Sequence, residues 1–81
     1  MKSSAQFLED ILKLIVGNPD EVKVTQNDLV LEVEAESSDL GVIIGKNGKN
    51  IRAFKSVVNL KTAKEGSSRL EIKIHEEAEN K

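Results

Sequence analysis

The 81-residue chain contains no cysteine, tryptophan or tyrosine, and it has only one histidine and two phenylalanines. The absence of cysteine excludes disulfides, thiolate metal sites and iron–sulfur clusters. The single histidine, His75, has no partner identifiable in the sequence with which to form a metal site or act as a general base. With so few aromatic rings, the chain also lacks the platform on which many domains stack nucleic-acid bases. We therefore expect no metal, no cofactor, no small-molecule substrate and no enzymatic activity.

Length and hydropathy set further limits on the architecture. A chain of 81 residues allows one small domain. No apolar run approaches the ~20 residues that cross a bilayer, and the N-terminal residues lead into an amphipathic stretch rather than the apolar core of a signal peptide. We expect a cytoplasmic protein without membrane association.

Charge is distributed unevenly, although the formal net charge of the whole chain is only −2. Residues 20–39 contain seven acidic side chains and one lysine, a net −6, whereas residues 40–64 contain six basic side chains and no acid, a net +6. This pattern predicts one face that attracts a polyanion and another that repels it. A basic helix is, however, more often a solvated face than a nucleic-acid site, so charge alone assigns no function.

Hydrophobic periodicity predicts a helix followed by two strands in the first half of the chain. The helix covers about residues 4–16, with Ser3 and Gln6 as a capping box and the sequence Gly17-Asn18-Pro19 as its stop. Alternating apolar residues over 21–25 and 29–36 predict two antiparallel strands, joined by a tight turn at Asn27-Asp28.

The second half of the chain predicts two helices and a third strand. A short helix has Ser37, Ser38 and Asp39 as N-cap candidates and closes at Gly45, a longer one runs from just after Gly48 to about residue 65, and the strand covers residues 70–75. A strand reached through two helices is usually parallel to the strand before them. We therefore expect an α+β domain over residues 1–75 of order α-β-β-α-α-β, with a three-stranded mixed sheet and three helices on one face. Residues 76–81 form a polar tail that we expect to fray.

Two glycines three positions apart, Gly45 and Gly48, separate the two predicted helices. Glycine has no Cβ, so here the chain can adopt left-handed dihedrals and a sugar–phosphate backbone can approach closely. The unpaired N–H groups and positive dipole end of the following helix can hold a phosphate, and Lys46, Lys49 and Arg52 add positive charge. A nucleotide-binding P-loop is excluded because its longer glycine run and its Lys-Ser/Thr ending are missing. A plain helix–helix turn, which also favours glycine, is the alternative.

The stretch Val42-Ile43-Ile44-Gly45-Lys46-Asn47-Gly48-Lys49-Asn50-Ile51-Arg52, set between two helices, resembles the GxxG segment of KH domains. In that family the loop clamps the backbone of about four nucleotides. The element order resembles the type II form. The segments Asn18-Pro19-Asp20-Glu21-Val22, Asp39-Leu40-Gly41 and Ala63-Lys64-Glu65-Gly66 are similar to the small single-domain bacterial KH proteins of the KhpA family. The resemblance extends to about residue 75 and departs from the family pattern at Val42, where a basic residue is common, which implies weaker affinity for RNA.

This resemblance implies binding of single-stranded RNA. The residues implied to contact its backbone are Gly45, Lys46, Asn47, Gly48, Lys49 and Arg52. The residues implied to line an aliphatic groove for the bases, or to stand directly under it, are Ile43, Ile44 and Ile51, with Leu31 and Val33 as weaker candidates. For Leu31, Val33 and Ile51, a place in the core is an equal alternative.

The resemblance also implies self-association, or pairing with a larger KH-containing partner, and a link to post-transcriptional, cell-envelope or division control. A core drawn from so short a chain is marginal, and dimerisation is one usual remedy. An exposed sheet edge, or an apolar strip around Val57 and Leu60, would provide the interface. The rival hypothesis is a protein-interaction module whose cellular role does not require RNA.

Overall fold

The protein, seen here in a computed structural model, is described over residues 2–75. Its elements are helix α1 (Ser4–Lys13), strands β1 (Lys23–Asn27) and β2 (Val30–Glu34), helices α2 (Ser37–Ile44) and α3 (Lys49–Glu65), and strand β3 (Glu71–Ile74), with short 3-10 turns η1 (Pro19–Glu21) and η2 (Lys46–Gly48). The predicted order α-β-β-α-α-β is confirmed. The predicted fraying of residues 76–81 lies outside the described residues.

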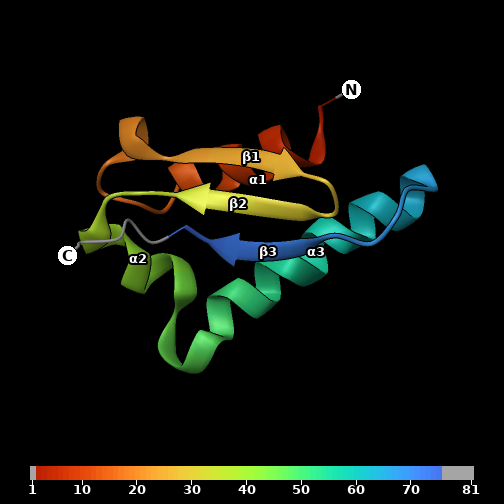
Figure 1. Cartoon of the computed structure of the whole chain (residues 1–81). Helices are drawn as coiled ribbons and strands as arrows, with labels where there is room; N and C mark the ends of the chain where they lie inside the picture. The colour runs from red at the N-terminus through yellow and green to blue at the C-terminus, as the bar shows by residue number, and fades with distance from the viewer. Residues whose placement is uncertain (1, 76–81) are drawn as a thin grey trace.

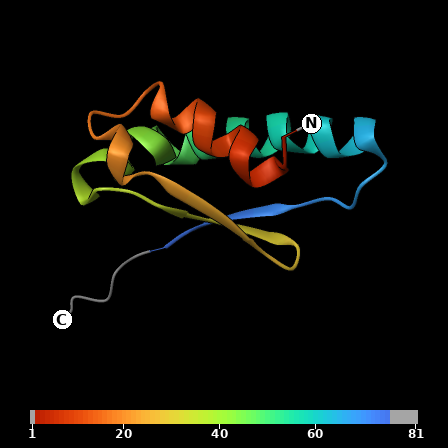
Figure 2. The same cartoon turned by 90° about the horizontal axis from the view of Figure 1, so that it is seen from above.

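Strand β2 is the centre of the sheet. It pairs antiparallel with β1, with Val24 opposite Val33, and parallel with β3, with Leu31 opposite Ile72. Figure 1 shows β3 at the edge of the sheet, and Figure 2 shows that all three helices lie on one side of it. The α+β class and the mixed three-stranded sheet covered on one face are therefore confirmed.

The hydrophobic core lies between the sheet and its layer of helices. Its fully buried large side chains are Leu8, Leu12, Leu31, Val33, Ile43 and Val58. Leu31 and Val33 are 0% exposed because they belong to the central strand and are covered by the helices. Of the two places that the sequence left open for this pair, the core is the correct one.

Helix α1 is shorter than its apolar pattern predicts. It begins as expected, with Ser3 Oγ accepting a hydrogen bond from the N–H of Gln6 at 3.1 Å. Its last residue is Lys13 rather than residue 16, because the chain tightens there into a turn in which the N–H of Ile15 donates to Leu12 O at 3.1 Å. Ile15 consequently leaves the predicted apolar stripe and is 41% exposed.

The reason for this early end lies in Asp39, which the sequence predicts as an N-cap candidate of α2. The N-cap is instead Glu36, and Asp39 lies in the first turn of α2 with only 6% of its surface exposed. Its carboxylate accepts hydrogen bonds from the N–H groups of Gly17 and Asn18, both at 3.0 Å, and from Asn18 Nδ2 at 3.1 Å. The bond from Gly17 chiefly, with those from Asn18, lowers the pKa of Asp39. This carboxylate therefore holds the chain that follows α1 against α2.

The turn between β1 and β2 lies one residue later than predicted. Asn27 pairs with Val30, so the two turn residues are Asp28 and Leu29, and Asp28 has a φ of +57°. Leu29, which the alternating pattern places on the buried face, is 48% exposed because it belongs to this turn. The end of α3 matches its prediction, since Gly66 ends the helix with a φ of +73°.

Candidate nucleic-acid interface

The GxxG loop (residues 45–48) makes a tight turn between α2 and α3. Gly45 ends α2, with its N–H donating to Gly41 O at 2.8 Å and its own φ at +77°. Asn47 and Gly48 follow with φ values of +58° and +74°, and the N–H of Gly48 donates back to Gly45 O at 3.1 Å. Three left-handed residues within four positions reverse the chain so that α3 begins at Lys49, as predicted.

The two glycines of the loop are required for different reasons. A Cβ on Gly45 would lie 2.6 Å from Asn50 Cγ and 2.7 Å from the backbone nitrogen of Asn50. A backbone atom cannot move aside as the end of a flexible side chain can. A Cβ on Gly48 would lie 3.1 Å from the guanidinium nitrogen Nη1 of Arg52, which is the far end of a flexible side chain, and in ordinary contact with Ile51 Cγ2 at 3.9 Å. Packing and conformation therefore both require glycine at Gly45, whereas conformation is the main requirement at Gly48.

Two side chains from the start of α3 are hydrogen-bonded to the segment before it. Asn50 Nδ2 donates to the carbonyl oxygen of Val42 in α2 at 2.7 Å. Arg52 Nη1 donates to the carbonyl oxygen of Asn47 in the loop, also at 2.7 Å. No sequence pattern singled out Asn50, and the available signal was its position in the first turn of a helix, where a short amide can reach back to the preceding chain.

The loop region is exposed and positively charged. Lys46, Asn47, Lys49 and Arg52 are all exposed. Among the ion pairs formed within residues 2–75, none involves Lys46 or Lys49. The first turn of α3 contains no acidic residue, and its N-cap, Gly48, provides no side-chain hydrogen bond. The positive end of this 17-residue helix therefore meets solvent beside the loop with no carboxylate of its own first turn to offset it.

The three isoleucines predicted beside the loop occupy two different environments. Ile43 is 1% exposed and belongs to the core, so it stands beneath the surface. Ile44 and Ile51, which come immediately before Gly45 and three residues after Gly48, are half-buried. Glycines, cations and two partly accessible aliphatic side chains thus gather at the junction of α2 and α3.

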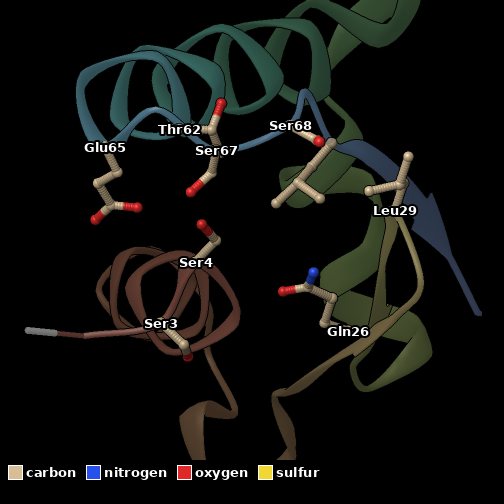
Figure 3. Close-up of a pocket in the computed structure, with 9 residues that line it drawn as sticks. Ser3, Ser4, Gln26, Leu29, Thr62, Glu65, Ser67 and Ser68 are labelled. Carbon is tan, nitrogen blue, oxygen red and sulfur yellow. The ribbon is translucent and has the colours of Figure 1, made fainter.

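A separate hollow of about 360 Å³ lies at the other end of α3. Its lining residues are Ser3, Ser4, Gln26, Leu29, Thr62, Glu65, Ser67, Ser68 and Leu70. Figure 3 shows hydroxyl groups pointing into it from the start of α1 and from the segment after α3. No lysine or arginine lines it, and the one carboxylate, that of Glu65, is paired with Lys61 Nζ at 2.5 Å. The hollow therefore lacks the cations with which a protein holds a nucleic-acid backbone.

Between residues 2 and 75, the histidine and acidic side chains do not form any group of three or more that could hold a metal ion. None of the helices in this part combines the length and the apolar character needed to cross a bilayer.

Comparison with known proteins gives consistent matches. A family model described as the KhpA/KhpB KH domain matches residues 5–74. The RNA-binding protein KhpA of Streptomyces coelicolor is 47% identical over 57 residues, which cover 65% of this chain and 72% of that protein. The RNA-binding protein KhpA of Clostridium acetobutylicum is 36% identical over 64 residues, 74% of this chain and 85% of that protein. The RNA-binding protein KhpA of Chlamydia pneumoniae is 30% identical over 76 residues, which cover 89% of this chain and 96% of that protein. No solved structure matches the chain significantly.

Proposed function

Because the chain belongs to the KhpA/KhpB family of KH domains, we propose that it binds single-stranded RNA at the junction of α2 and α3. The observation that carries this proposal is the geometry of the GxxG loop. It places two half-buried glycines at the N-terminus of a long helix, with the exposed Lys46 between them and the exposed Lys49 directly after them. We propose that this binding takes place in the cytoplasm.

Phosphate groups would lie on the loop itself. Gly45 and Gly48 have no side chains of their own to keep a sugar–phosphate backbone away from their peptide groups, and the positive pole of α3 points to the same place. Lys46 and Lys49 contribute long flexible ammonium groups that follow the phosphates, and Asn47 contributes an amide. Arg52 adds a third positive charge beside the loop.

Bases would lie against aliphatic rather than aromatic side chains. Ile44 and Ile51 offer partly exposed apolar surface before and after the loop, whereas Ile43 lies in the core. A KH loop holds about four nucleotides, so base contacts are few and we expect weak affinity with low sequence selectivity from one copy. Double-stranded RNA should bind less well, because its bases are paired.

A double substitution, Lys46→Asp with Asn47→Asp, tests this proposal. Both side chains are exposed, so the new carboxylates would repel phosphate while leaving the core intact. We expect loss of binding to a fluorescent single-stranded oligoribonucleotide, measured by anisotropy, with an unchanged melting temperature. The matched control is Lys23→Asp with Asn27→Asp, which makes the same chemical changes at two exposed positions of β1. The proposal would be contradicted if both variants lost the same amount of RNA affinity, or if neither variant bound RNA more weakly than the wild type.

Two further readouts locate the contact on the wild-type protein. In a titration with short oligonucleotides, backbone amide signals of residues 43–52 should shift. With two or three phosphate contacts, the logarithm of affinity should fall with the logarithm of salt concentration at a slope of about −1.4 to −2.1. A salt-independent affinity would rule out phosphate contacts as the basis of binding.

The second candidate function is assembly, which the exposed apolar side chains of α3 favour. Val57 and Leu60 are 40% and 71% exposed and lie three residues apart, which places them on one face of the helix. We propose that this strip joins two copies of the chain, or one copy and a larger KH-containing partner, in the control of the cell envelope or division. If assembly is the primary role, the Lys46→Asp, Asn47→Asp variant keeps its partner and its cellular role.

Sedimentation of Leu60→Asp tests the strip directly. We expect this variant to be monomeric at concentrations where the wild type forms dimers. Leu14→Asp is the matched control, because Leu14 is 85% exposed but lies at the end of α1. A wild-type protein that remains monomeric at all concentrations would rule out the homodimer.

A further inference from the structure

Arg52 differs from the two lysines beside it in that its side chain is engaged within the protein. Its Nη1 atom donates a hydrogen bond to the carbonyl oxygen of Asn47 at 2.7 Å, across the width of the loop. The same atom is the nearest neighbour of the space in which a Cβ of Gly48 would lie. Between residues 2 and 75, by contrast, no side-chain hydrogen bond or ion pair is found for Lys46 or Lys49. The guanidinium group thus covers one side of the loop and binds its backbone.

The hydrogen bond from Arg52 is accepted by Asn47, the residue of the loop whose backbone conformation is least favourable. Asn47 adopts φ +58° and ψ 27°, a left-handed conformation that a residue with a side chain adopts infrequently. Such a conformation persists where the surroundings hold it in place. The hydrogen bond that Arg52 of α3 donates to the carbonyl group of Asn47 stabilises this conformation.

Asn50 supplies a second attachment, at the end of α2. Its amide donates to Val42 O at 2.7 Å, and its side chain and backbone fill the space beside Gly45. Two side chains from the start of α3 therefore fasten the end of α2 and the middle of the loop to the same helix. Together they hold the conformation that places Gly45 and Gly48, which have no side chains, directly before the start of α3.

We infer that Arg52 is a positioning residue, which raises the affinity for RNA by ordering the GxxG loop before RNA arrives and not by contacting a phosphate. This inference rests on the proposed RNA-binding function. Ordering the backbone of one residue has a free-energy cost that corresponds to about tenfold in affinity. When the loop is ordered in advance, RNA binding does not have to meet this cost.

A matched pair of variants, Arg52→Met and Lys49→Met, tests the inference. Each removes one positive charge and leaves an unbranched side chain on the same exposed part of α3. In the RNA-free protein, Arg52→Met should lower the ¹⁵N heteronuclear NOE of Asn47 and Gly48, whereas Lys49→Met should leave both values unchanged. Toward single-stranded RNA, Arg52→Met should lose about tenfold in affinity with an unaltered salt slope, whereas Lys49→Met should reduce the slope by about 0.7.

The opposite pattern would overturn the inference. If Arg52→Met reduces the slope by about 0.7 and keeps the loop as ordered as in the wild type, then Arg52 contacts a phosphate directly. Loss of loop order without loss of affinity would equally refute a role in binding. If the wild-type protein does not bind RNA at all, the proposed function fails, and the NOE comparison in the RNA-free protein still decides whether Arg52 holds the loop.

Discussion

Replacement of Gly45 by alanine should destabilise the fold more than the same change at the other left-handed glycines. Two effects act together at this position. At a φ of +77° and a ψ of 169°, a residue with a Cβ is strained by about 1–3 kcal/mol. In addition, the new methyl group would lie 2.7 Å from the backbone nitrogen of Asn50, an overpacking that costs about 1–3 kcal/mol when rigid atoms must shift.

The two costs together span about 2–6 kcal/mol, and we take about 3 kcal/mol, in the lower half of this range, as the expected total. For a domain of 81 residues the whole free energy of unfolding is about 4–12 kcal/mol, so this change removes a large fraction of it. In a chain of this size each kcal/mol lowers the melting temperature by about 4–8 °C. We therefore expect Gly45→Ala to melt roughly 12–24 °C below the wild type.

Two control glycines separate strain from collision. Gly66 has a φ of +73° but no heavy atom within 4 Å of the place where its Cβ would lie, so Gly66→Ala should show only the conformational cost, about 1 kcal/mol. Gly41 lies inside α2 without a left-handed φ and with the same open surroundings. Gly41→Ala should therefore stabilise the helix by about 0.5–1 kcal/mol.

Thermal unfolding followed by circular dichroism ranks the three variants against the wild type. The reasoning requires Gly45→Ala to melt lowest, Gly66→Ala to lie between it and the wild type, and Gly41→Ala to melt at or above the wild type. Equal melting temperatures for Gly45→Ala and Gly66→Ala would refute the claim that Asn50 leaves no room for a side chain.

Two further predictions concern buried polar groups. The hydrogen bonds from Gly17 and Asn18 lower the pKa of Asp39 in the folded state, so its stabilising effect is complete above about pH 4 and is lost as the pH falls through the folded pKa. The difference in melting temperature between wild type and Asp39→Asn should shrink below pH 4, and a difference independent of pH would contradict this role. Asn59 is 8% exposed, and its amide accepts from the N–H of Leu70 at 2.8 Å and donates to the carbonyl oxygen of Leu70 at 2.9 Å. Asn59→Ala should cost about 2–4 kcal/mol, measured as a lower urea midpoint, because both buried groups of Leu70 lose their partner.

Local signals predicted the elements more reliably than their ends. Apolar periodicity, alternation and glycine positions act over a few residues, and they led to the correct order, the pairing directions and the start of α3 at Lys49. The turn at Asp28-Leu29 was misplaced by one residue, because Asn27 and Asp28 both tolerate a positive φ and the pairing of Asn27 with Val30 decides between them. Boundaries depend on contacts that a short window of sequence does not contain.

The amino-acid sequence alone determined that two helices meet at a glycine loop with a lysine inside it and another directly after it, because spacing and residue type are local properties. Only the tertiary structure decided which isoleucine is accessible: Ile43 enters the core and Ile44 is half-buried. It also decided that Arg52 donates a hydrogen bond to a loop carbonyl group. Likewise, α1 ends early because the N–H of Gly17 donates to the carboxylate of Asp39, 22 residues further along the chain. These outcomes depend on the packing of helices against a sheet, which brings together groups far apart in the chain and satisfies their hydrogen bonds away from water.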